Sequence, residues 1–208
     1  GWPTRAFEVT AIQGGTGSLS AGASGHIGAN VGGGSYVSAA RTATISSIPN
    51  WTVYGGFIGG QGQNGNNHPG GGGGGANQAG ESPSSNTDHA GYGGDGKIIA
   101  NMGPHGESYY WAAGGGGSCV KYEAGPSDRA GGAGGTGGGG GGTSTRGWAG
   151  LGGAGGINGG KEGRSRVDYN VNLNFCVFGG DAGLNTGSGG GSPGGLGGDG
   201  IVMIKFTA

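Results

Sequence analysis

The stretch Gly131–Gly142 reads GGAGGTGGGGGG, so ten of its twelve residues are glycine. Shorter tracts of the same kind recur along the chain, and glycine supplies 65 of the 208 residues. An interior helical glycine costs about 1 kcal/mol relative to alanine, which excludes an ordinary helical protein. A collagen triple helix is excluded as well, because the chain has only 7 prolines and glycine follows no strict three-residue period along it.

Glycine tracts of this length have few side chains to bury, so their stability depends on backbone groups. Their N–H and C=O groups need partners, and neighbouring tracts can supply them. The left-handed polyproline-II helix has three residues per turn and no internal hydrogen bonds, which leaves these groups free to bond to other segments. We therefore expect tracts such as Gly131–Gly142 to form polyglycine-II helices that pack against one another.

Short strand-like islands separate the tracts. The clearest is Arg166–Phe178, in which apolar and polar residues alternate over ten positions, as in a strand with one buried face. The other islands are Thr4–Gln13, Ser35–Ile48, Asn50–Ile58, Lys97–Met102, Glu107–Ala113, Cys119–Glu123 and Ile201–Thr207. Together they predict one all-β domain over residues 1–208 with essentially no α-helix.

The islands, the sequence AAGGGG at Ala112–Gly117 and the C-terminal GGDGIVMIKFT resemble the glycine-rich domains of phage tail-fibre adhesins and bacterial surface proteins. The resemblance implies a β-sandwich or jelly-roll-like frame that carries polyglycine-II segments. It implies no catalytic residues. Where members of this family bind receptors, variable loops between the glycine segments make the contact.

Three glycine patterns resemble catalytic or ligand-binding motifs, but each lacks a feature that its motif requires. GGINGGK at Gly155–Lys161 is followed by Glu162 where a phosphate-binding loop needs Ser or Thr. A nucleophile elbow at Ser192 would need an amide from the next residue, Pro193, which has none. A calcium nonapeptide matches once, around Asp199, and partly around Asp95, but that motif works as stacked copies.

These failures predict a protein that is not an enzyme and has no cofactor. The four histidines show no metal-ligand spacing. The 10 basic residues are scattered and matched by 11 acidic ones, which disfavours nucleic-acid binding. No apolar run is long enough to cross a membrane as a helix.

Several single residues are candidates for contacts or modification. Cys119 and Cys176 are compatible with one disulfide in an oxidising environment, and equally with a thiol at Cys176. Asn50 begins a glycosylation sequon, which matters only in a eukaryotic source. Tyr92 and Trp148 stand among glycines, so each either caps a glycine bundle or contacts a partner. The other candidate partner contacts are Tyr110 and His89.

The composition favours an extracellular or virion structural protein, a subunit of a self-assembling surface fibre. Low net charge removes the repulsion between copies, and Thr4–Gln13 or Ile201–Thr207 could extend the sheet of a neighbouring copy. The alternative is a tail-fibre-type adhesin whose loops at Asn64–His68, Glu81–His89 and Lys121–Arg129 bind a cell-surface receptor or glycan. An ice-binding protein is the third hypothesis.

Overall fold

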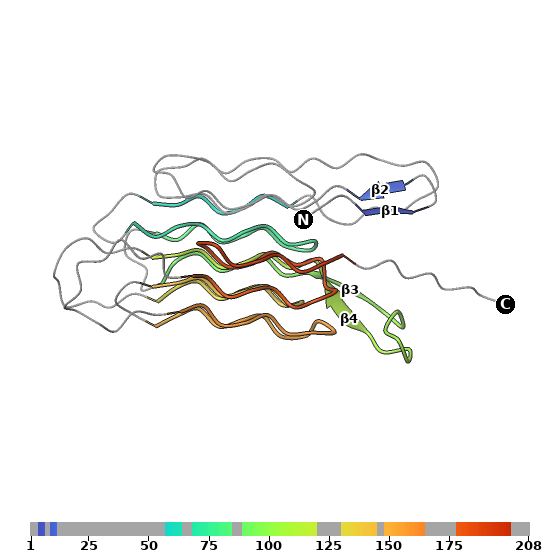
Figure 1. Cartoon of the computed structure of the whole chain (residues 1–208). Coiled ribbons are helices and arrows are strands. Elements are labelled where there is room, and N and C mark those ends of the chain that lie inside the picture. The colour runs from blue at the N-terminus through green and yellow to red at the C-terminus, as the bar shows by residue number, and fades with distance from the viewer. Residues whose placement is uncertain are drawn as a thin grey trace.

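The computed structural model describes residues 4–6, 9–11, 57–63, 68–84, 89–119, 130–144, 148–164 and 178–200. This part of the chain contains no helix, and its regular strands form two antiparallel pairs (Figure 1). In one pair β1 (Thr4–Ala6) lies beside β2 (Val9–Ala11). In the other, β3 (Lys97–Ile99) lies beside β4 (Tyr109–Trp111).

The prediction of one continuous strand over Thr4–Gln13 is wrong. Ala6 pairs with Val9, so the chain reverses direction between β1 and β2. The two residues at this reversal are Phe7 and Glu8, which carry none of the glycine, proline or asparagine signals that usually mark a turn. Sequence patterning therefore merged two short strands into one.

The strands expected at Lys97–Met102 and Glu107–Ala113 are confirmed over shorter spans, 97–99 and 109–111. Asn101 and Ala112 adopt left-handed backbone angles, with φ of 56° and 57°, which end the extended conformation. Ser35–Ile48 and Ile201–Thr207 lie outside the described residues, and so does all of Arg166–Phe178 except Phe178. Asn50–Ile58 and Cys119–Glu123 fall mostly outside them, so the β-sandwich or jelly-roll-like frame and the single domain 1–208 stay predictions.

Most of the described chain consists of extended glycine-rich segments that run side by side across Figure 1. Bonds between neighbouring segments recur every third residue. Ala90, Gly93 and Gly96 donate to the carbonyl groups of 130, 133 and 136 in a parallel neighbour. Gly70, Gly73 and Ala76 donate to 118, 115 and 112 in an antiparallel one. An interval of three equals the repeat of the polyproline-II helix.

These bonds arrange the segments in layers. The outer layer contains 78–84, 89–96, 130–136 and 148–154, each bonded to the next. The middle layer contains, in spatial order, 57–63, 68–76, 112–119, 138–144 and 158–164. Segments 178–184 and 187–192 cover the other side of the middle layer, and 193–199 lies beyond them. From residue 89 to residue 164 the chain alternates between the outer and the middle layer.

Segment 138–144 shows how the layers hold together, because it bonds to neighbours on all sides. The N–H groups of residues 139–143 donate to segments 130–136, 187–192 and 158–164 in a repeating order. The C=O groups of residues 138–143 accept from three other segments, 178–184, 148–154 and 112–119, also in a repeating order. Donors and acceptors therefore point to different neighbours, and the backbone of this segment is buried with its polar groups satisfied.

This packing leaves no room for a side chain at most of the interior glycines. A Cβ atom added at Gly141 would overlap the carbonyl oxygen of Gly150, and one at Gly116 would overlap that of Gly132. Because these neighbours are backbone atoms, no rotamer change can relieve the overlap. Glycine is required here by the distance between segments, and the six glycines of 137–142 provide it.

We predict that Gly141→Ala lowers the free energy of unfolding by about 3 kcal/mol or more, because the new methyl group forces segments 138–144 and 148–154 apart. Gly159→Ala is the matched control, since the nearest atom to its added Cβ would be 3.8 Å away. The control should change stability by less than about 1 kcal/mol. Chemical denaturation of both variants measures the difference, and equal stabilities would contradict the packing argument.

Candidate functional site

The outward face of the outer layer carries side chains at every third position of three parallel segments. In segment 130–136 the glycines between them face neighbouring segments. A Cβ atom at Gly132 would overlap Gly91 in the same layer, and one at Gly134 would overlap Gly139 in the middle layer. The third position points away from the bundle. We call this surface the outer face, and it comprises His89, Tyr92, Asp95, Ala130, Ala133, Thr136, Trp148, Leu151 and Ala154.

Hydrogen bonds set these residues in rows across the three segments. The hydrogen bonds between segments 89–96 and 130–136 recur at intervals of three residues in both segments, and so do those between 130–136 and 148–154. The row nearest one end of the bundle is His89, Ala130 and Trp148. The next row contains Tyr92, Ala133 and Leu151. Small side chains thus lie between a pair of stacked rings on one side and an indole with a leucine on the other.

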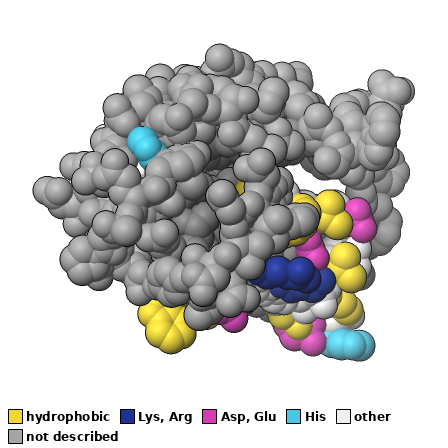
Figure 2. Space-filling model, turned by 60° about the vertical axis from the view of Figure 1, so that its left-hand side comes forward, with side chains coloured by type: hydrophobic (Ala, Val, Ile, Leu, Met, Phe, Trp, Pro, Cys, Tyr) yellow, Lys and Arg dark blue, Asp and Glu magenta, His cyan; other side chains and the backbone are white. Residues whose placement is uncertain are grey.

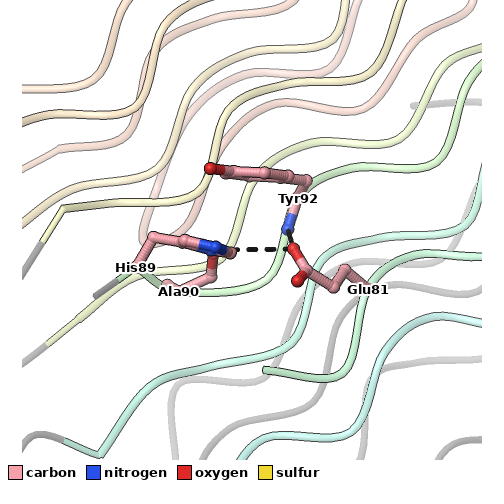
Figure 3. Close-up of polar contacts among 4 residues, drawn as sticks. All are labelled: Glu81, His89, Ala90 and Tyr92. Atoms are coloured by element: carbon pink, nitrogen blue, oxygen red, sulfur yellow. Dashed lines mark hydrogen bonds and ion pairs between the residues drawn. The ribbon is translucent and has the colours of Figure 1, made fainter. Parts of the chain in front are cut away.

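His89 and Tyr92 stack with ring centroids 4.2 Å apart and planes within 10° (Figure 3). Glu81, on the neighbouring segment, accepts a hydrogen bond from the backbone N–H of Tyr92 at 2.9 Å. The same carboxylate oxygen lies 3.7 Å from Nδ1 of His89, and that nitrogen is 2.9 Å from the carbonyl oxygen of Ala90. The Glu81 bond holds the backbone of Tyr92, and stacking on His89 orients its ring.

The rings of the outer face are open to solvent. Trp148 is 82% exposed, Leu151 65% and Tyr92 44%. A tryptophan this exposed is unusual, since its large apolar surface favours burial. Hydrophobic side chains elsewhere form separate groups at the rim of the molecule, mixed with charged ones (Figure 2). The indole of Trp148 is therefore not buried against the glycine bundle, and contact with a partner stays a prediction.

The charges of the outer layer are of one sign. Its described residues include Glu81 and Asp95 but neither lysine nor arginine. Asp95 has a structural role, because its Oδ1 accepts the backbone N–H of Thr136 at 2.7 Å. Among the described residues no group of three or more His, Cys, Asp or Glu side chains is arranged to hold a metal ion.

Of the four predicted contact residues, the structure brings three together and separates one. His89, Tyr92 and Trp148 share the outer face. Tyr110 is half-buried at the other end of the bundle, where its amide bonds to Gly155 and its side chain lies beside Gly137 and Gly155. Tyr110 therefore caps the bundle. Its strand neighbour Trp111 is buried and meets Tyr109 edge to face.

Other candidate residues are placed only in part. Cys119 is buried beside Pro69 and Ser144. Cys176 and Asn50 lie outside the described residues, so the disulfide and the glycosylation site stay predictions. Sequence reasoning missed Glu81 as the residue that positions Tyr92, and Leu151 as part of the face. One signal was available: Ala130-Gly-Gly-Ala133-Gly-Gly-Thr136 repeats with the period of the backbone bonds.

The two ends of the bundle differ in their connections. At the end near Pro69, Cys119 and Ser144, the described segments stop on both sides of five intervals that the structure does not describe. These intervals are 64–67, 85–88, 120–129, 145–147 and 165–177. At the opposite end the chain reverses tightly, as where Gly75 bonds to Gln78 and where Asn185 and Gly187 have positive φ. The β3–β4 hairpin is the long connection described at that end.

Comparison with models of known protein families, with curated proteins and with solved structures finds no match to this chain. No helix long and apolar enough to cross a membrane occurs among the residues that the structure describes.

Beyond the outer face, segments 158–164 and 178–184 carry one ion pair. Nζ of Lys161 lies 2.9 Å from the carboxylate of Asp181. The hydrogen bond from Lys161, followed by one from the amide of Leu196, lowers the pKa of Asp181 below its ordinary value of 3.8. The pair is exposed, so its contribution to stability is small.

We predict that Lys161→Met raises the pKa of Asp181 toward 3.8, measured by NMR titration. A lowered folded-state pKa stabilises the fold above the unfolded-state pKa, and this contribution disappears as pH falls through the folded-state value. The variant should therefore be less stable by about 0.5 kcal/mol at neutral pH and equally stable once Asp181 is protonated. A pKa unmoved in the variant would contradict the assigned cause.

Trp148→Ala should leave the free energy of unfolding within about 0.5 kcal/mol of the original, because the side chain is exposed. Trp111→Ala, the matched variant, removes a side chain that is 6% exposed and should cost about 3–5 kcal/mol. Thermal or chemical unfolding of the two variants makes the comparison. A large loss of stability in the Trp148 variant would show that this residue is structural.

Proposed function

We propose that the chain is a non-enzymatic binding domain on the outside of a virion or cell, of the tail-fibre adhesin type. In this proposal the glycine-rich segments are polyglycine-II helices that form a rigid body, and the connections at one end contact a cell surface. The observation that carries the proposal is the difference between the two ends. Binding residues concentrate on loops that a rigid scaffold positions.

The side chains of the outer face favour the hypothesis of a discrete domain and disfavour that of a fibre that grows sideways. A further glycine segment could pack on the bundle only where the surface segment beneath it has no side chains on its outward face, as in the interior. On the outer face, Tyr92, Trp148 and Leu151 occupy the space that a further layer would need. They limit growth of the bundle in this direction, much as charges and bulges protect the edge strands of sheets.

A fibre subunit remains the second candidate because the described sheets are only two strands wide. Within the described chain β3 pairs only with β4, and Ile98 is 46% exposed. A strand from another copy could pair there and extend the assembly. If so, negative-stain electron microscopy will show filaments, and Ile98→Lys will shorten or abolish them. A monodisperse protein without filaments leaves the adhesin as the proposal.

The adhesin proposal predicts that loop replacement abolishes cell binding. Residues 85–88 and 120–129 are exchanged for Gly/Ser sequences of equal length, and the labelled protein is applied to a panel of bacterial strains. Binding should fall at least tenfold, because the contact surface is removed while the bundle is kept. Exchange of the hairpin tip 101–107, at the opposite end, is the matched control and should leave binding unchanged. Equal loss in both variants would argue against binding at one end.

A further inference from the structure

The outer face presents two sets of exposed rings that the end connections do not account for. The rings lie on either side of the small residues Ala130 and Ala133, close to the end of the bundle near Pro69, Cys119 and Ser144. We propose that this face is a binding platform for a neutral saccharide, with Tyr92 and Trp148 as its two ring contacts. The inference builds on the proposed adhesin function, since it supplies a ligand class for the same end of the molecule.

The rings suit a sugar because they are open and held in orientation. One side of a pyranose ring presents C–H groups that pack on the flat face of an aromatic ring. Trp148 offers an indole that is 82% exposed. The Tyr92 ring stacks parallel to His89 at 4.2 Å, and this stacking reduces the side-chain freedom that binding would remove.

Polar groups beside the rings suit the hydroxyl groups of a sugar. The backbone N–H group of Ala133 and the C=O group of Gly134 have no hydrogen-bond partner within the described chain. The Glu81 carboxylate is partly exposed and can accept further hydrogen bonds. Donors and acceptors thus alternate with apolar surface, and a sugar has the same mixture of hydroxyl and C–H groups.

Charge restricts the saccharide to a neutral one. The described outer layer holds two carboxylates, Glu81 and Asp95, and no lysine or arginine. A sulfated or phosphorylated sugar would meet repulsion from these two carboxylates, so the described charges favour a neutral sugar.

The same polar groups disfavour a proline-rich peptide, the other common ligand of exposed aromatic rows. Proline has no N–H group. Such a peptide would therefore leave the Glu81 carboxylate and the Gly134 carbonyl with few donors, whereas every free hydroxyl of a sugar can donate to them.

The test uses the full chain and immobilised hexasaccharides of glucose, galactose, mannose and N-acetylglucosamine, with a sulfated hexasaccharide and a Pro-rich decapeptide as competing classes. We expect at least one neutral probe to bind and to change the tryptophan fluorescence. The sulfated probe and the peptide should bind at least tenfold more weakly. Trp148→Ala and Tyr92→Ala should each weaken binding of the neutral probe about tenfold or more, and Trp148→Phe should retain most of it.

Leu196→Ala is the matched control, because Leu196 is 70% exposed but lies on segment 193–199, away from the outer face. It should bind the probe like the original chain, and thermal unfolding checks that every variant is folded. Three results would each overturn the inference: no neutral probe binds, binding survives both ring substitutions, or the sulfated probe or peptide binds more tightly.

The outcomes separate this inference from the proposed function. Loss of cell binding after loop replacement, together with no binding of neutral probes, would keep the adhesin and remove the saccharide platform. Probe binding that depends on Trp148 and Tyr92, together with unchanged cell binding after loop replacement, would keep the platform and reject the loops as the contact surface.

Discussion

Close approach of backbone to backbone is the constraint on which the described bundle depends. In segment 138–144 the amides of residues 139–143 and the carbonyls of residues 138–143 bond to other segments, and donors and acceptors point to separate neighbours. Such bonding requires the segments to be so close that only a hydrogen atom fits on each interior α-carbon. A protein of this kind replaces the usual interlocking of apolar side chains with a lattice of backbone hydrogen bonds. The conformational entropy lost by ordering glycine is the main opposing term.

The same constraint decides where side chains can stand. Segments in the middle of the bundle, such as 138–144, are glycine almost throughout, and segments at its surface carry one larger residue in three. The rows on the outer face follow directly from this geometry. Tyr92 and Leu151, although far apart in sequence, fall in the same row because both occupy the outward position of parallel segments that are hydrogen-bonded in step through 130–136. The side chains on this surface are thus positioned by the backbone lattice.

Sequence patterning could predict part of this arrangement. Glycine content and island spacing correctly excluded helices from the described residues, and the strands around Lys97 and Tyr109 were located, though too long. The reversal between β1 and β2 was missed because Phe7 and Glu8 look like strand residues. Sequence identified Tyr92 and Trp148 as contact candidates because they stand among glycines, and it offered His89 as a further candidate. It could not bring them together, because their proximity depends on which segments are neighbours. Tyr110 looked equivalent but is placed against Gly155 by its backbone bond.

The three-residue repeat of the outer face also governs how the length of this chain can change. Adding one residue within segment 130–136 would rotate everything after it by a third of a turn, bringing alanine side chains into the interior and glycines to the surface. Three added residues would preserve the orientation of every side chain and lengthen the segment by one turn, about 9 Å. Gains and losses of sequence within these segments are therefore confined to multiples of three if the scaffold is to keep its register.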